Sequence, residues 1–193
     1  MPEPGDLLAP SPGADTLFRG RGAWPWSPRA TVIAGATAVA TATMATLVWA
    51  PSPILVWNAS ASAPIGLYRV SASREAVRSD MVIAWPPDAA RRLGAERHYL
   101  PANVPLVKRV AGTAGDRVCA EGRVVTVNGR LAAVRRSEDL RGRPLPWWRG
   151  CEVLRPGDLF LLTADVPQAF DGRYFGVTRR GQIIGRARLL WRR

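Results

Sequence analysis

An uncharged segment runs from Ala30 to Tyr68, and its first 21 residues, Ala30 to Ala50, are mostly Ala, Thr and larger apolar side chains. A helix of about 20 residues is needed to cross the ~30 Å hydrocarbon core of a bilayer. Arginines precede the segment, so the positive-inside rule places the N-terminus in the cytoplasm. These features predict a transmembrane anchor over residues 30–56, after a cytoplasmic, disordered tail (1–29) and before an exported domain (57–193).

A cleaved signal peptide is the alternative, because the small residues Ala61 and Ala63 follow the apolar run as they do at a signal peptidase site. The 29-residue leader and the 21-residue apolar core both exceed the dimensions of such a peptide. We therefore favour an uncleaved, single-pass anchor in a bacterial inner membrane, with the exported domain in the periplasm.

The chain is strongly basic, with a formal net charge of +12. Such a charge suits nucleic acid or an anionic membrane surface. The sequence has no helix-turn-helix, zinc-finger or aromatic RNA-binding signature, so we expect no nucleic-acid partner and favour attraction to the membrane. Cys119 and Cys151 form no Cys-x-x-Cys pair, and a single His cannot complete a zinc site with them. We expect no metal and no cofactor.

Beyond the anchor, short alternating segments and turns predict a mostly β domain. Residues 123–134 alternate around Asn128-Gly129, a dipeptide that fits a two-residue hairpin turn because both residues tolerate positive φ. Further strands are expected over residues 80–85, 104–112, 157–163 and 182–191. One helix is expected over residues 88–98, with Asp88 as its N-cap.

Lys108 is the only lysine in the chain and the first candidate for chemistry. Strand alternation places it on one face with Leu106 and Val110, so its amine would be buried among apolar side chains. Making a lysine half neutral at pH 7 requires lowering its pKa by about 3.4, which full burial can do. Arg109 would act in the same direction if it were close. The alternative is a lysine that extends into solvent from a strand edge.

Ser62, held by the following Ala63-Pro64, is the candidate nucleophile, since a neutral lysine can activate a serine hydroxyl. Ser60 lies two residues earlier and could supply a hydroxyl to an oxyanion hole. A linker of small residues is the alternative for both serines. A Ser-His-Asp triad would have to use His98, the only histidine, which has no Ser-rich turn nearby, and we do not favour it.

Three stretches together resemble the type I signal peptidases, the serine–lysine family. "NASASAPIGLY" (58–68) resembles the nucleophile region, and its ending resembles the conjugative transfer subgroup, the TraF type. "LVKRVAGTAGDRV" (106–118) resembles the lysine box and "FDGRYFG" (170–176) the last box. Order and spacing match over about residues 30–193. Ala63, where general signal peptidases carry Met, supports the transfer subgroup.

The resemblance implies a mostly β, signal-peptidase-like catalytic domain with one N-terminal transmembrane helix and an apolar surface near the membrane. It implies Ser62 as nucleophile, Lys108 as general base, and an oxyanion hole made by the Ser60 hydroxyl and the Ser62 backbone N–H. Asp171 matches an acid of the last box, and we expect it to pair with Arg173 and support the site. An exported domain also permits disulfides, so we expect a Cys119–Cys151 bond.

The activity implied is that of a membrane-anchored serine endopeptidase acting on an exported precursor protein presented at the lipid bilayer. The subgroup implies maturation of a pilin-like precursor for conjugation and type IV secretion, by hydrolysis or by cyclisation of the product. The alternatives are a housekeeping signal peptidase, a non-catalytic envelope protein on a single anchor, and a secreted basic binding module released near Ala63. The sequence leaves Trp147 and Trp148 open as core, membrane-contact or groove residues.

Overall fold

A computed structural model describes residues 27–48 and 53–193 of the chain. The structure divides into two units, Met1–Pro51 and Ser52–Arg193. The prediction of a disordered tail falls almost entirely on residues outside those described.

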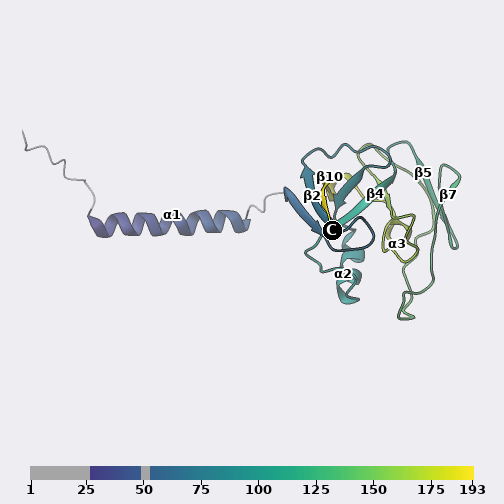
Figure 1. The fold of residues 1–193 in the computed structure, drawn as a ribbon, viewed down its shortest axis with the longest axis horizontal. Helices are drawn as coiled ribbons and strands as arrows, with labels where there is room; N and C mark the ends of the chain where they lie inside the picture. Colours follow the sequence, from purple (N-terminus) through teal and green to yellow (C-terminus); the bar gives the residue numbers. More distant parts are fainter. Residues whose placement is uncertain (1–26, 49–52) are drawn as a thin grey trace, which may run out of the picture. The chain divides into compact units, whose positions relative to one another are not determined.

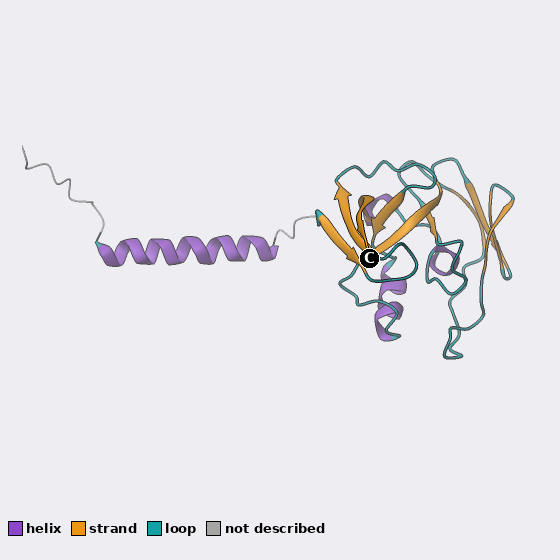
Figure 2. Cartoon of the chain, in the orientation of Figure 1, coloured by secondary structure: helices purple, strands orange, loops and turns teal. Residues whose placement is uncertain are grey.

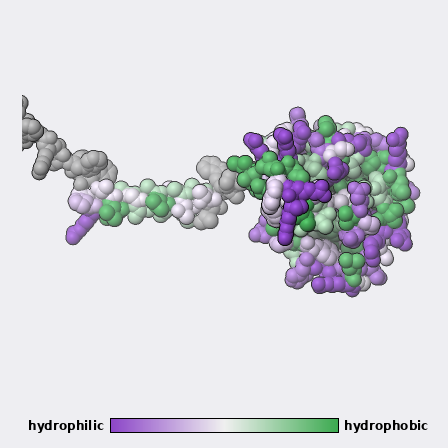
Figure 3. All heavy atoms as spheres, in the orientation of Figure 1, coloured by the Kyte–Doolittle hydropathy of each residue, from purple (hydrophilic) through white to green (hydrophobic). Residues whose placement is uncertain are grey.

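The first unit contains helix α1 (Pro28–Val48), which is 21 residues long. The backbone N–H of Ala30 donates to the Ser27 hydroxyl at 3.3 Å, so Ser27 caps the helix. Several threonine hydroxyls donate to the carbonyl oxygen four residues earlier, at 2.8–2.9 Å, namely those of Thr37, Thr41 and Thr43. Figure 3 shows apolar and weakly polar residues side by side along this helix. Within the two described ranges, no helix combines the length and hydropathy needed to cross a membrane.

The second unit is mostly β, as predicted, and its strands form two antiparallel sheets (Figures 1 and 2). The six-stranded sheet contains, in spatial order, β1 (Leu55–Asn58), β2 (Gly66–Ser71), β10 (Ile183–Arg192), β3 (Met81–Ala84), β4 (Leu106–Gly112) and β9 (Phe160–Leu162). The four-stranded sheet contains β7 (Arg130–Val134), β6 (Val124–Val127), β5 (Arg117–Glu121) and β8 (Gly150–Val153). Two further short helices, α3 (Gly172–Phe175) and the 3-10 turn η1 (Arg180–Gln182), follow β9.

The predicted hairpin is confirmed, because β6 and β7 pair around Asn128 and Gly129, whose φ angles are 51° and 76°. The predicted helix is shorter than expected: α2 spans Asp88–Glu96. The expectation that Asp88 caps it is wrong. Pro87 occupies the N-cap position, and Asp88 is already helical, so its carboxylate pairs with Arg91 one turn later at 2.9 Å.

The C-terminal end of the predicted anchor also needs correction. Leu55 and Val56, which the prediction included in the anchor, belong to strand β1. They pair with Arg69 and Tyr68 of β2. The uncharged run therefore contains a helix and then a strand, separated by a segment in which Pro53 cannot continue a helix.

The core beneath the six-stranded sheet holds the segment that carries Ser62. Ala63, which follows Ser62 directly, is buried in a cluster with Tyr68, Ile83 and Val107. Each fully buried aliphatic or aromatic side chain contributes roughly 1.5–3 kcal/mol to folding. Ser62 is thus attached directly to a buried residue of this core.

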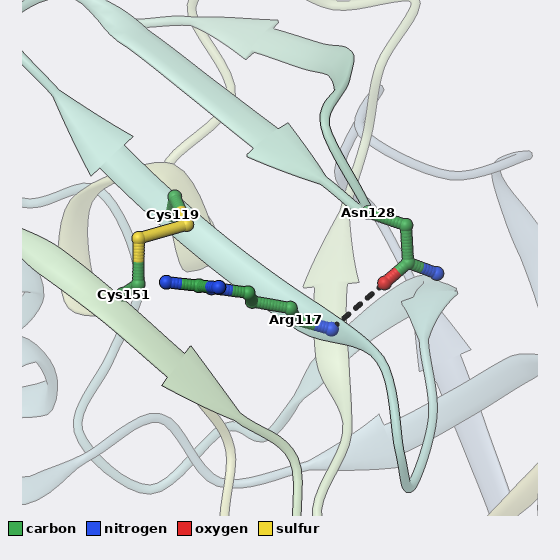
Figure 4. The surroundings of a disulfide bond; sticks show 4 residues. All are labelled: Arg117, Cys119, Asn128 and Cys151. Carbon is green, nitrogen blue, oxygen red and sulfur yellow. Dashed lines mark hydrogen bonds between the residues drawn. A yellow bond between two sulfur atoms is a disulfide. The ribbon is translucent and has the colours of Figure 1, made fainter.

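The expected disulfide is present and joins Cys119 of β5 to Cys151 of β8 at directly opposed positions (Figure 4). On the other edge of β5, the backbone N–H of Arg117 donates to the Asn128 side-chain oxygen at 2.8 Å. The disulfide between Cys119 and Cys151 closes a loop that contains the whole β6–β7 hairpin.

Candidate active site

A groove of about 780 Å³ lies in the second unit, and it brings Ser60, Ser62 and Lys108 together. One wall follows α2, over residues 97–106, and another follows β7, within residues 136–145. The sequence predicted all three groups, and they come from separate elements: the loop after β1 and the middle of β4.

Asn58, the last residue of β1, holds the serine loop in shape and was missed in the sequence. It is 7% exposed, and its side-chain N–H₂ group donates to the carbonyl oxygens of Ser60, Ala63 and Pro64 at 2.9–3.1 Å. Its side-chain oxygen accepts from the Ser60 N–H at 3.1 Å. Asparagine is suited to this task because one side chain both donates to and accepts from a turn.

The two serine hydroxyls lie against each other. Ser60 Oγ is 2.9 Å from Ser62 Oγ, and it also accepts from the Ser62 backbone N–H at 3.2 Å. The two donors expected for an oxyanion hole, Ser60 O–H and Ser62 N–H, are therefore side by side next to the candidate nucleophile.

Lys108 is 2% exposed and lies between buried residues of β4, Val107 and Val110, with Arg109 as the exposed neighbour. Burial lowers the pKa of Lys108 from 10.5 to about 8, while the charge of Asp171 raises it and that of Arg173 lowers it. The amine is therefore partly neutral near pH 8 and can accept a proton.

Arg109 was expected to lower the pKa of Lys108 if the two side chains were close, and that condition is not met. Arg109 is exposed on the opposite face of β4 and donates to the Ser79 carbonyl oxygen at 3.1 Å. The positive group that lowers the pKa of Lys108 is Arg173, which comes from α3. Strand alternation separates residues 108 and 109, whereas chain folding brings residue 173 in.

Thr163, the residue after β9, was not singled out in the sequence and connects the two candidate catalytic residues. Lys108 Nζ lies 3.3 Å from Thr163 Oγ1. Thr163 Oγ1 donates to the Ser62 carbonyl oxygen at 2.9 Å. Among the hydrogen bonds of the described ranges, Thr163 therefore links Lys108 to the backbone of Ser62, while the Ser62 hydroxyl lies against that of Ser60.

Asp171 and Arg173 form the expected ion pair, with Arg173 Nε 2.8 Å from Asp171 Oδ1, and both residues are buried. Arg173 also donates to the carbonyl oxygens of Thr163 (2.7 Å) and Pro167 (3.1 Å). Gly172 between them is needed because a Cβ there would lie 2.7 Å from the Leu161 carbonyl oxygen. The last box thus fixes the segment after β9 to α3.

Asp139 joins the two walls of the groove. Its carboxylate accepts from the Tyr99 hydroxyl and pairs with Arg143 Nε at 2.7 Å, while Arg97 Nη1 lies 3.9 Å away. His98, with a φ of 58°, lies exposed on the same wall. The walls are therefore held by a network that does not include the serines or Lys108.

The sequence left the environments of Trp147 and Trp148 open, and the structure places the two side chains differently. Trp148 packs against the core formed by the four-stranded sheet and donates from its indole N–H to the Gly172 carbonyl oxygen at 3.0 Å. Trp147 lies with its ring 4.7 Å from the Arg135 guanidinium and donates to the Arg136 carbonyl oxygen at 3.0 Å. Neither lines the groove. In the described part of the chain, no three His, Cys, Asp or Glu side chains gather as metal ligands.

Residues 27–192 match the family described as signal peptidase, peptidase S26. A plasmid transfer protein TraF of Escherichia coli is 34% identical over 137 residues, which is 66% of this chain and 77% of that protein. A conjugal transfer protein TraF of Agrobacterium fabrum is 34% identical over 141 residues, or 68% of this chain and 78% of that one.

Solved structures include a signal peptidase I from Enterococcus faecalis, to which the chain is similar with a TM-score of 0.32 and 20% identity. That similarity covers 58% of this chain and 96% of the other.

Proposed function

Because the chain belongs to the signal peptidase family, peptidase S26, and to its TraF subgroup, we propose that it is a membrane-anchored serine endopeptidase with a Ser62/Lys108 dyad. One observation carries the proposal: a half-buried serine and the only lysine, fully buried, line one groove. A lysine confined in this way has a chemical use that an arginine does not, because an arginine keeps its proton.

The first step is attack by Ser62. Neutral Lys108 takes the proton of Ser62 Oγ as the oxygen attacks the carbonyl carbon that follows a small residue of the substrate. The Ser60 hydroxyl leaves its partner Ser62 Oγ and, with the Ser62 N–H, donates to the oxyanion. Such a donor contributes roughly 2.7–4 kcal/mol in a comparable site.

The second step releases the leaving amine. The protonated Lys108 returns its proton to that nitrogen as the carbon–nitrogen bond breaks, which leaves an acyl group on Ser62 Oγ. A water molecule then loses a proton to Lys108 as its oxygen attacks the ester, and Lys108 returns that proton to Ser62 Oγ as the bond between the acyl carbon and Oγ breaks, which releases a carboxylic acid product. An amine of the substrate can replace the water, and the product is then a new amide.

The substrate is proposed to be an exported precursor protein of a conjugative, type IV secretion apparatus, a pilin-like precursor in particular. The printed names of the relatives, plasmid transfer and conjugal transfer protein, support this choice. The groove supports it physically, since apolar residues such as Leu106, Val107 and Leu145 line it and suit an extended apolar peptide.

We also propose that α1 anchors the chain in a bacterial inner membrane, with the second unit in the periplasm. The helix has 21 residues, or about 32 Å at 1.5 Å per residue, and no charged residue after Arg29. Its threonine hydroxyls are satisfied within the helix, which lowers their cost in lipid. Alkaline carbonate extraction tests the anchor: the full chain should stay with the membrane, and release into the supernatant would exclude it.

Paired substitutions test the dyad. Ser62→Ala and Lys108→Arg should each abolish cleavage of a membrane-presented precursor. Two matched controls should retain activity: Ser71→Ala, at an exposed serine of β2, and Arg109→Lys, which places a second lysine on the exposed face of β4 and leaves Lys108 in place. An active Lys108→Arg enzyme would contradict the dyad.

The rival functions give different results in the same system. A non-catalytic envelope protein would show no reaction of Ser62 with a serine-directed acylating probe. A housekeeping signal peptidase would react with the probe and would cleave general leader peptides as well as pilin precursors. Product mass distinguishes hydrolysis from cyclisation, because the cyclic product lacks one water.

A further inference from the structure

The hydrogen bonds at Thr163 have a fixed direction. A carbonyl oxygen only accepts, so the single proton of the Thr163 hydroxyl is used in its 2.9 Å bond to Ser62. Lys108 must then be the donor in its 3.3 Å contact with Thr163 Oγ1. The chain of bonds runs from Lys108 N–H, through Thr163 O–H, to the carbonyl oxygen of Ser62.

The fact that Lys108 donates to Thr163 determines where the lone pair of a neutral Lys108 can point. A neutral amine has two N–H bonds and one lone pair, and a general base needs the lone pair aimed at the serine hydroxyl. We propose that Thr163 is a positioning residue: by accepting one N–H of Lys108 while bound to the Ser62 backbone, it turns the lone pair toward Ser62 Oγ. The inference rests on the proposed dyad and adds a third residue to it.

The Asp171–Arg173 pair supports the same role from behind. Asp171 Oδ2 accepts from the Thr163 N–H at 2.8 Å, and Arg173 Nη2 donates to the Thr163 carbonyl oxygen at 2.7 Å. Both polar groups of the Thr163 backbone are therefore held by one buried ion pair. Asp171 and Arg173 thus act on Lys108 through the placement of Thr163 as well as through their charges.

The pH profile of variants separates positioning from simple packing. The charged groups that face Lys108 are Asp171 and Arg173, and neither changes when Thr163 is replaced. The Thr163 oxygen accepts a hydrogen bond from Lys108, and this bond is stronger when Lys108 is a charged ammonium group than when it is a neutral amine. Loss of the oxygen therefore removes an interaction that stabilises the charged form of Lys108. The pKa of Lys108 should therefore fall, while the misaligned amine makes the reaction slower at every pH.

The experiment compares three substitutions of Thr163 in the full-length protein, two that remove the hydroxyl and one that keeps it. Cleavage of a precursor is measured for each from pH 6 to pH 10. Thr163→Val and Thr163→Ala should lower kcat about 100-fold, within the range for loss of general-base alignment, with KM changed less than about twofold. Their acid limbs should move to lower pH. Thr163→Ser keeps the hydroxyl and should recover activity to within about fivefold of the wild type. Thr126→Val, the same change at a half-buried position of β6, should have no effect.

The outcomes are decisive in both directions. Full activity of Thr163→Ala at high pH, or a Thr163→Ser variant as slow as Thr163→Ala, would overturn the positioning role. Using two hydroxyl-free variants keeps the test valid if Val at this position prevents folding, which thermal unfolding would reveal. Activity that survives Ser62→Ala would instead refute the proposed dyad, so the two failures are distinguishable.

Discussion

Lys108 and Arg109 are adjacent in β4 and lie in opposite environments. Lys108 is 2% exposed and contacts Thr163, whereas Arg109 is exposed and donates to the Ser79 carbonyl oxygen. Strand alternation points the two basic side chains to opposite faces of the sheet. Only Lys108 therefore lies where the proposed proton transfer takes place, and Arg109 is a surface charge.

The rate of cleavage should rise with pH through an acid limb near pH 8. Lys108 acts as a base only when neutral, and burial lowers its pKa to about 8, so the neutral fraction increases as pH rises. At pH 6 this fraction is about 1%, and kcat/KM should be roughly 100-fold below its plateau. Measurement of kcat/KM from pH 6 to pH 10 checks this. His98→Gln should leave the limb in place, and a limb that moves with His98 would contradict the assignment.

Replacing Lys108 by Met should stabilise the protein while abolishing activity. The pKa of Lys108 is lower in the folded state (about 8) than in the unfolded chain (10.5), so the buried amine reduces stability at neutral pH. Each pKa unit corresponds to ~1.4 kcal/mol, so the free energy of unfolding should rise by up to about 3 kcal/mol at pH 7.

The sign of this effect depends on pH. As pH rises from about 8 to 10.5, wild-type stability increases, because the unfolded chain still binds a proton that the folded chain has lost. The advantage of Lys108→Met should therefore shrink over this window. Chemical denaturation of both proteins at pH 7 and pH 10.5 measures it, and an equal difference at both values would refute the explanation.

Asn58→Asp should disrupt the serine loop. Asn58 donates to three carbonyl oxygens, and a carboxylate in its place can only accept and would repel them. We expect a loss of about 1–3 kcal/mol in unfolding free energy, the usual cost of unsatisfied buried groups, together with at least tenfold lower kcat. Asn103→Asp, at an exposed loop position, is the matched control and should change neither quantity. Wild-type kinetics in Asn58→Asp would exclude a role for this side chain.

Removal of the disulfide should lower stability without affecting chemistry. Cys119 and Cys151 are separated by 32 residues in sequence, and a loop of this size is worth about 3–4 kcal/mol in the chain-entropy model. Neither cysteine lines the groove, so the Cys119→Ser/Cys151→Ser enzyme should retain kcat at 25 °C. Thiol titration of the wild type under denaturing, non-reducing conditions should find no free thiol, and two free thiols would contradict the bond.

Local patterns were enough to predict much of the fold. The Asn128-Gly129 turn, the alternating strands and the boxes around Ser62, Lys108 and Asp171 are all visible along the chain. Strand β1 was hidden because an uncharged run gives the same signal for a helix and for a buried strand. The four-residue strand β8 has mostly exposed side chains and no alternation to detect it.

The parts of the site that could not be predicted depend on contacts between residues that are distant in the sequence. Thr163 lies 101 residues from Ser62 and 55 from Lys108, and no periodicity in one strand relates them. Asn58 was within reach of sequence reasoning, since an asparagine before a tight loop is a common turn-forming residue. The position of Arg173 beside Lys108 required the chain fold itself.

Two carboxylates hold different parts of the candidate site in place. Asp171 holds the segment that carries Thr163, whereas Asp139 holds the groove walls to each other through Tyr99 and Arg143. Under the proposed function, the groove walls contact the substrate away from the cleaved bond, and the proposed reacting groups are supported by a different carboxylate. For protein engineering, residues 97–106 together with residues 136–145 are the segments to exchange with those of a relative in order to redesign the selectivity of the proposed peptidase.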